Sequence, residues 1–159
     1  MNTSYPICDY ITLFLGIADI DVSPITHFLV PQSSYSSNAK SDYCLVSLVD
    51  ASFDVSSIDE PIAVCLVSPS AQNNQSENVV LGNLAITATS GSTIYHHQFT
   101  PNGVKYLIPA RPSEIRLRGL TTQTKADLAL TLGYATLKFE YLSKEQVEAL
   151  NSQSNYTTF

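Results

Sequence analysis

Hydrophobic residues in this chain occur in short continuous or alternating runs, separated by polar and proline-rich breaks. Alternation of apolar and polar residues is typical of β-strands, and many short strands in succession indicate a sandwich or a barrel. We predict strands at Ile11–Ala18, Thr26–Val30, Tyr43–Val49, Ile62–Val67, Val79–Thr89, Thr93–Phe99, Val104–Ile108, Glu114–Leu120 and Ala126–Tyr141. The predicted fold class is all-β: an antiparallel β-sandwich of jelly-roll type, in which two sheets stack face to face.

The alternation within one predicted strand separates a core face from an outer face. Ile115 and Leu117 alternate with Arg116 and Arg118 along the chain. Successive side chains of a strand point to opposite faces of the sheet. The pattern therefore predicts a half-buried strand whose outer face is cationic.

The last long run, Ala126–Tyr141, changes its apolar phase at Gly133. The apolar positions are Leu128, Leu130 and Leu132 before the change and Ala135, Leu137 and Phe139 after it. A slip of one residue at a glycine is what a β-bulge produces. We expect one long bent strand, or two strands, with a bulge at Gly133-Tyr134.

Proline, glycine and polar residues mark the connections between the strands. In Pro101-Asn102-Gly103 the Asn-Gly pair tolerates positive φ, which predicts a tight hairpin between the strands on its two sides. Pro109–Pro112 lacks two amide donors, which is typical of a loop. The polar stretches Pro31–Ser41 and Pro69–Asn78 are predicted as longer loops, which are often functional.

One short helix is predicted near the C-terminus. Ser143 and Gln146 match a capping box, and Val147 and Leu150 supply an apolar stripe behind it. The polar residues 151–159 either fray or dock onto a neighbouring subunit. The predicted division is a β-sandwich domain over 1–142 and a short helix with a polar tail over 143–159.

The charge of the chain limits the classes of molecule that it is expected to bind. The chain has 159 residues and a net charge of −6, and it has no basic N-terminal arm, which argues against direct binding of nucleic acid. Only 14% of its residues are charged, against roughly 25% in an average globular protein. Seven of the eight basic residues fall between Lys105 and Lys144. They form either a solvated face of two or three strands or a mildly basic patch that faces an acidic partner.

The cysteines and the N-terminus bear on the compartment. Cys44 and Cys65 lie inside apolar runs, which predicts buried free thiols. The third cysteine, Cys8, makes the count odd, which argues against a disulfide framework and a zinc site. The N-terminus lacks a positively charged signal region, and the run Ile11–Ile17 is too short to span a membrane. We therefore expect assembly in a reducing cytoplasm and no membrane partner.

Candidate groups for catalysis or metal binding are few. None of the histidines, His27, His96 and His97, stands in a recognisable pattern with a nucleophile and a carboxylate. Adjacent side chains on a strand point to opposite faces, so His96 and His97 cannot chelate one ion together. Asp19 and Asp21 would share a strand face but supply too few oxygens for Ca²⁺. No residue is assigned to catalysis, to a cofactor or to a metal.

Contact with other proteins is the remaining function for the polar and aromatic residues outside the predicted core. Tyrosine and arginine are enriched at protein interfaces. The predicted interface residues are Arg111, Arg116, Arg118, Tyr35, Tyr156 and Phe159.

The segments Leu107–Leu120 and Leu130–Phe139 resemble the C-terminal strands of small virion β-proteins of DNA viruses and phages, a group of single jelly-roll capsid, penton, decoration and spike proteins. The resemblance implies a structural virion component, located in the virion and assembled in the host cytoplasm. Its implied partners are other capsid proteins and further copies of itself, as a homotrimer or homopentamer. The alternative is a carbohydrate- or receptor-binding β-sandwich module, with a host receptor or glycan as its partner.

Overall fold

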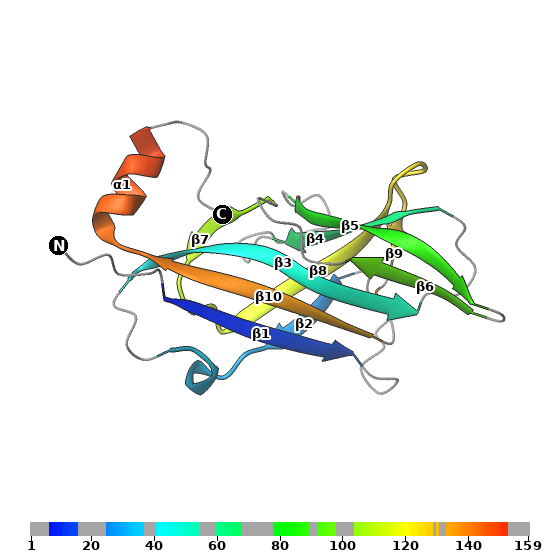
Figure 1. The fold of residues 1–159 in the computed structure, drawn as a ribbon, viewed down its shortest axis with the longest axis horizontal. Coiled ribbons are helices and arrows are strands. Elements are labelled where there is room, and N and C mark those ends of the chain that lie inside the picture. The colour runs from blue at the N-terminus through cyan, green and yellow to red at the C-terminus, as the bar shows by residue number, and fades with distance from the viewer. Residues whose placement is uncertain are drawn as a thin grey trace.

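The computed structural model describes residues 7–15, 25–36, 41–54, 60–67, 78–89, 92–97, 104–128, 130 and 133–152 (Figure 1). These residues form strands with one α-helix near the C-terminus. The strands are β1 (Cys8–Leu15), β2 (Ile25–Leu29), β3 (Tyr43–Asp54), β4 (Ile62–Val67), β5 (Asn78–Thr89), β6 (Ser92–His97), β7 (Tyr106–Pro109), β8 (Glu114–Thr121), β9 (Asp127–Leu128) and β10 (Gly133–Leu142). A 3-10 turn spans Gln32–Ser34, and the helix α1 spans Lys144–Ser152.

The strands form two antiparallel layers that share β5. The first layer has the order β1-β10-β3-β6, and the second has the order β2-β8-β4-β5. The first part of β5 pairs with β4, and Ala85–Thr89 pairs with β6, so β5 joins the layers along one side. β1 and β2 end the two layers on the other side, and Figure 1 shows β1, β10 and β3 crossing in front of β8 and β2. The predicted all-β antiparallel sandwich is confirmed.

The pairing of the main strands is nested along the chain. β1 pairs with β10, β2 with β8, β3 with β6, and β4 with β5. The chain is therefore arranged as one long antiparallel hairpin whose two arms are rolled into two layers. The short strands β7 and β9 lie off this path and pair with β3 and β8.

One edge of β3 receives two strands in succession. β6 pairs with Ala51–Asp54, and β7 pairs with Tyr43–Val46, both antiparallel to β3. The prediction of a hairpin between the strands on either side of Pro101-Asn102-Gly103 is therefore wrong, because both strands use the twelve-residue β3 as their partner. The tripeptide itself lies outside the described residues.

The burial of the strands follows their hydrophobic patterns. β4 is buried at all six positions, as expected for a continuous apolar run within a sheet. β10 alternates, and its buried side chains Ala135, Leu137 and Phe139 face the second layer within the main core. The predicted burial of the free thiols of Cys44 and Cys65 is confirmed, since 0% and 1% of these residues are exposed.

The phase change near Gly133 marks the passage of the chain from one layer to the other. β9 pairs with β8 in the second layer, whereas β10 pairs with β1 and β3 in the first. The two-strand form of the prediction is therefore confirmed, but a bulge at Gly133-Tyr134 is wrong. Gly133 pairs regularly with Phe53, and the register of β10 with β3 shifts between Thr136 and Leu137, where Val49 is the additional residue of β3.

α1 begins at the predicted capping box and covers one end of the first layer. The backbone amide of Ser143 donates to Oε1 of Gln146 at 2.8 Å, and the amide of Gln146 donates to Oγ of Ser143 at 3.2 Å. Val147 and Leu150 pack on a second cluster of buried side chains, which comprises Leu45, Leu107 and Leu142. Within the described part of the chain, no helix is long and apolar enough to cross a membrane.

Candidate contact surface

The two arginines of β8 do not form the predicted cationic outer face. Arg116 is half-buried, and its Nε and Nη2 donate to the carboxylate of Glu114 at 3.3 and 3.4 Å. Glu114 also bonds to Nδ1 of His27 on β2. These hydrogen bonds, first from His27 and then from Arg116, hold the pKa of Glu114 below its ordinary value. Arg118 is only 8% exposed, so the prediction of an exposed interface side chain there is corrected.

Arg111 holds a loop against the core. Its backbone adopts φ of 54°, in the left-handed region that is uncommon for residues other than glycine. Its guanidinium lies 5.2 Å from the ring centre of Tyr141, and Nη1 donates to the backbone oxygen of Ser41 at 3.2 Å. Arg111 is half-buried, so this predicted interface residue already has an intramolecular role.

Tyr35 was predicted as a surface contact, and its burial corrects that prediction. It is only 5% exposed, and its ring packs edge to face on Phe139 with ring centres 5.7 Å apart. Its hydroxyl donates to the backbone oxygen of Pro112 at 2.6 Å. Burial raises the pKa of this phenol well above its ordinary value. Tyr35 therefore connects the segment after β2 to the core.

The remaining predicted contact residues are Tyr156 and Phe159, and both lie outside the described residues. The basic residues of the C-terminal half lie on the sheets, a loop, a turn and the helix, and Lys105 and Lys138 contact the same carboxylate, that of Glu140. These basic residues are Lys105, Arg111, Arg116, Arg118, Lys125, Lys138 and Lys144.

The candidate groups for catalysis or metal binding are described only in part. Asp19 and Asp21 fall outside the described residues. His96 and His97 are neighbours on β6, where His96 pairs with Ser52 and His97 with Ala51. Across the described ranges, no group of three or more His, Cys, Asp or Glu side chains could hold a metal ion.

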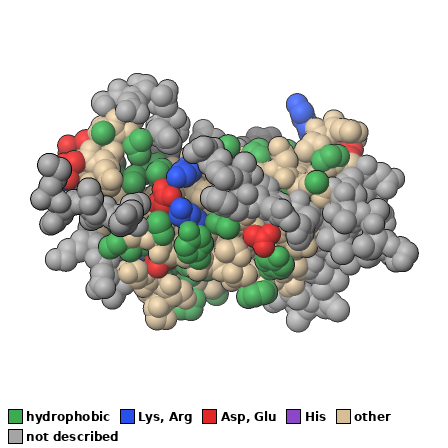
Figure 2. Space-filling view, in the orientation of Figure 1, with side chains coloured by type: hydrophobic (Ala, Val, Ile, Leu, Met, Phe, Trp, Pro, Cys, Tyr) green, Lys and Arg blue, Asp and Glu red, His purple; other side chains and the backbone are tan. Residues whose placement is uncertain are grey.

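The most exposed hydrophobic side chains lie on the strands that end the two layers. Tyr10 and Phe14 of β1 are 61% and 72% exposed, and Leu29 of β2 is 83% exposed. Tyr10, Thr12 and Phe14 project from the outer face of β1, whereas Leu13 and Leu15 enter the core. Figure 2 shows a face on which hydrophobic side chains lie among polar and charged ones. We call Tyr10 and Phe14 the edge patch, and Leu29 faces outward from the other layer.

The neighbouring strand β10 supports the edge patch from one side. The rings of Phe14 and Tyr134 are tilted, with centres 6.4 Å apart, and Oγ1 of Thr12 lies 2.9 Å from Oγ1 of Thr136. Nζ of Lys138 lies 5.9 Å from the ring centre of Tyr10. These cross-strand contacts orient the exposed side chains of β1.

The two lysines beside the edge patch share one carboxylate within the chain. Lys138 and Lys105 approach the same oxygen of Glu140, with N–O distances of 2.9 and 3.1 Å. Burial would raise the pKa of Glu140, but hydrogen bonds from Lys138 and Lys105 outweigh it and lower the pKa. The hydrogen bond to Glu140 also raises the pKa of Lys138. A partner that covers the edge patch therefore meets two lysines that share one carboxylate, with one positive charge in excess.

Sequence reasoning missed the edge patch because the predicted strand, Ile11–Ala18, began after Tyr10 and its two faces were not assigned. The signal was present in the alternation, since Tyr10 and Phe14 occupy the phase opposite to Leu13 and Leu15. In most half-exposed strands that phase carries polar residues. Aromatic residues in the outward phase of an edge strand are therefore the sequence feature that indicates this surface.

Comparisons of the chain with protein-family models, with curated proteins and with solved structures gave no match.

Proposed function

We propose that this chain is a structural virion component that acts through contacts between copies of itself. In this role it occupies a capsid, minor capsid, decoration or spike position and needs no catalytic activity. The edge of β1, which carries exposed aromatic side chains and neither lysine nor proline, is the observation that carries the proposal. Its location would be the virion, after assembly in the host cytoplasm, with other capsid proteins as further partners.

The nested strand pairing supports a jelly-roll assignment within the sandwich class. Jelly rolls are double-sheet structures of eight strands, and capsid domains are among the proteins built on them. Eight strands remain here when β7 and β9 are set aside, in two layers of four. Capsid and lectin domains share this architecture, so the fold favours a contact role without selecting the partner.

The side chains of β1 lack the usual protection of an edge strand. Natural proteins place lysine, proline or bulges on exposed edges to prevent pairing with other chains. The eight residues of β1 include neither lysine nor proline, and their pairing with β10 is regular. The one charged side chain, Asp9, accepts hydrogen bonds from Tyr141 and from the backbone of Ser36. Among the described strands, β10 is the one that pairs with β1, so the other edge of β1 has no strand partner there.

The edge patch gives the outer face of β1 an apolar surface to bury. Tyr10 and Phe14 share this face. Aromatic residues are enriched at interfaces, and burial of apolar area drives association. A second copy that covers β1 would remove both the unpaired backbone groups and the exposed rings from water. In a trimer or pentamer with closed rotational symmetry, β1 of every copy would be covered in the same way.

Imaging of the full chain tests this proposal. Negative-stain electron microscopy of the purified protein is expected to show rings or larger closed assemblies. Phe14→Lys places a charge on the outer face of β1 and is expected to leave single subunits. Gln123→Lys adds the same charge at an exposed position in the turn before β9 and serves as the control. Single subunits in both the parent and the control would overturn the proposal.

A glycan- or receptor-binding module is the second candidate, and the same surface favours it. Phe14 and Tyr134 form an aromatic pair, Oδ2 of Asp50 accepts a hydrogen bond from Tyr134 at 2.9 Å, and Tyr10 lies further along the same face of β1. Aromatic rings provide stacking surfaces, and carboxylates accept hydrogen bonds from hydroxyl groups. Glycan-array binding that disappears in Tyr10→Ala and persists in Gln123→Lys would favour this candidate. Tyr35 is unsuitable for such a test because it is buried.

A further inference from the structure

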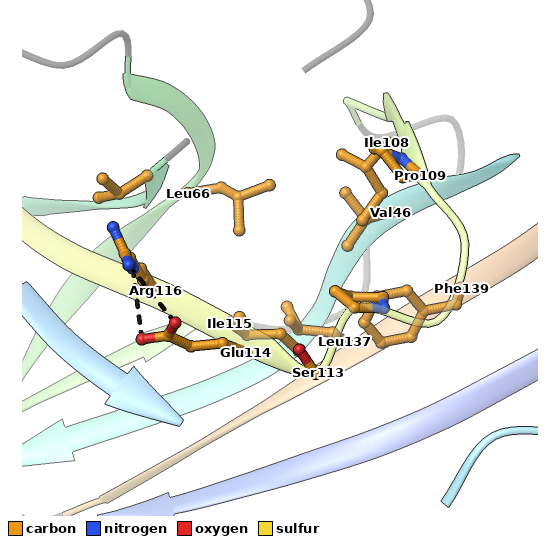
Figure 3. Close-up of a pocket in the computed structure, with 12 residues that line it drawn as sticks. Val46, Leu66, Ile108, Pro109, Ser113, Glu114, Ile115, Arg116, Leu137 and Phe139 are labelled. Carbon is orange, nitrogen blue, oxygen red and sulfur yellow. Dashed lines mark hydrogen bonds and ion pairs between the residues drawn. The ribbon is translucent and has the colours of Figure 1, made fainter. Parts of the chain in front are cut away.

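A cavity of about 260 Å³ lies between the two layers, at the end where β4 and β7 finish and β8 begins (Figure 3). Its first wall consists of Val46 on β3 with Leu137 and Phe139 on β10. Its second wall consists of Leu66 on β4 with Ile115 on β8. Figure 3 shows Leu66 pointing toward Val46 and Ile108 across the space.

The walls of the cavity are apolar and fixed by the surrounding core. Val46, Leu137 and Phe139 are completely buried, and Leu66 and Ile115 belong to the same core cluster. Protein interiors are close-packed, with few voids larger than a water molecule. A space of this size among fixed side chains is therefore a preformed site. Water is a poor occupant, because it needs two to four polar partners that these walls do not offer.

The rim of the cavity carries two charges that neutralise each other. β4 makes its last pairing with β8 between Leu66 and Leu117, and β8 extends further, to Glu114. Glu114 and Arg116 line this end of the cavity and are joined by two hydrogen bonds. A charged ligand head group would have to compete with this pair. The rim therefore favours a ligand without net charge.

The volume limits the ligand to a small molecule. An apolar cavity of ~150 Å³ holds benzene, and drug-sized ligands occupy pockets of roughly 300–1,000 Å³. The cavity of about 260 Å³ lies between these sizes. It is large enough for a single substituted ring or a medium-length alkyl chain.

We propose that the cavity between the layers binds a small neutral hydrophobic molecule, of the class of medium-chain alcohols and alkyl-substituted benzenes. The apolar group lies between Leu66 and Leu137, and a neutral polar end reaches the rim at Glu114 and Arg116. This binding is independent of assembly, because the edge patch residues do not line the cavity.

Titration of the full chain with 1-octanol, followed by methyl NMR and calorimetry, tests the proposal. Saturable shifts are expected at the methyl groups of Ile108, Ile115 and Leu137, with little change at Leu13 and Leu15, which lie elsewhere in the core. Octanoate and octylammonium, which carry opposite charges on the same chain, are expected to bind roughly tenfold more weakly or worse. No saturable shift at the cavity methyls would overturn the proposal.

A variant in which a larger side chain fills the cavity tests where the ligand binds, and the same substitution at an exposed position is its control. Val46→Phe adds a ring inside the cavity and is expected to abolish the binding of 1-octanol. Val104→Phe makes the same change at an exposed position and is expected to bind as the parent does. If Val46→Phe does not fold, Leu66→Phe takes its place. The methyl shifts measured on the parent protein test the binding without either variant. Equal binding by the filled variant and by Val104→Phe would contradict the proposed location.

Discussion

Gly133 lies against the backbone of Ser52 so closely that a Cβ atom at Gly133 would stand 2.0 Å from the Ser52 carbonyl oxygen. The same atom would lie 2.9 Å from the Cα of Phe53. The two strands meet here at the first residue of β10, where the chain enters the first layer. The glycine is therefore required by the close approach of two strands.

Replacing this glycine is expected to weaken the fold. Gly133→Ala places its methyl group on backbone atoms of β3, which cannot move aside as a flexible side chain can. Overpacking of this kind costs about 1–3 kcal/mol in the free energy of unfolding. Urea denaturation of the parent and the variant measures the difference. A variant as stable as the parent would show that the strands can separate there without cost.

The carboxylate of Asp9 connects β1 to two other segments. Its Oδ2 accepts hydrogen bonds from the Tyr141 hydroxyl at 2.5 Å and from the Ser36 amide at 2.7 Å. Asp9→Asn keeps the shape but removes the charge, and we expect a loss of about 1–3 kcal/mol in stability. A double-mutant cycle with Tyr141→Phe isolates the pair. Strictly additive effects of the two substitutions would rule out the coupling that this geometry requires.

Glu114 is expected to make the stability of the protein depend on acid pH. Hydrogen bonds from His27 and Arg116 lower its folded-state pKa. The unfolded chain therefore binds the proton more readily, and this stabilisation is complete above the ordinary glutamate pKa of about 4.3. The stabilisation is lost as the pH falls through the lowered pKa that Glu114 has in the folded protein. The effect is modest because solvent screens the His27 side chain, which is 49% exposed.

The substitution Glu114→Gln isolates that contribution. Melting temperatures measured from neutral to acid pH are expected to fall less steeply in this variant than in the parent. Glu148→Gln, on an exposed position of α1, serves as the matched control and should retain the slope of the parent. Identical acid slopes in the parent and in Glu114→Gln would contradict the assignment.

Cys8 is expected to react with thiol reagents before the other two cysteines. Burial raises the pKa of Cys44 to about 12, and Cys65 is equally inaccessible, whereas Cys8 is half-buried. A water-soluble thiol reagent should therefore modify Cys8 first in the native protein, and slowly, because burial raises its pKa as well. Peptide mapping after labelling checks the order. Modification of Cys44 before Cys8 under native conditions would be inconsistent with the fold.

Local patterns predicted the strands and the helix, since they depend on neighbouring residues. The alternation in β10, the apolar run of β4 and the capping box at Ser143 each indicate their own structure. Long-range features were not accessible in this way. The polar segment around Tyr35 gave no sign that its ring packs on Phe139, and Arg118 has the alternation of an exposed residue yet is buried.

The partner of each strand was the second feature that the sequence did not specify. An Asn-Gly pair favours a hairpin when the flanking strands are free to pair, but β6 and β7 both pair with the long strand β3. The edge patch was missed for a related reason. A hydrophobic residue at an edge and one in the core look alike until the neighbours of the strand are known.

Sedimentation equilibrium of the purified full chain tests the central claim, that the molecule associates through the edge of β1, most directly. The parent protein is predicted to give a mass that is a whole multiple of 17.3 kDa, three or five by the proposed symmetry. Phe14→Lys is predicted to reduce that mass to a single chain, and Gln123→Lys to leave it unchanged. A parent protein that sediments as a 17.3 kDa monomer over the whole accessible concentration range would contradict the claim.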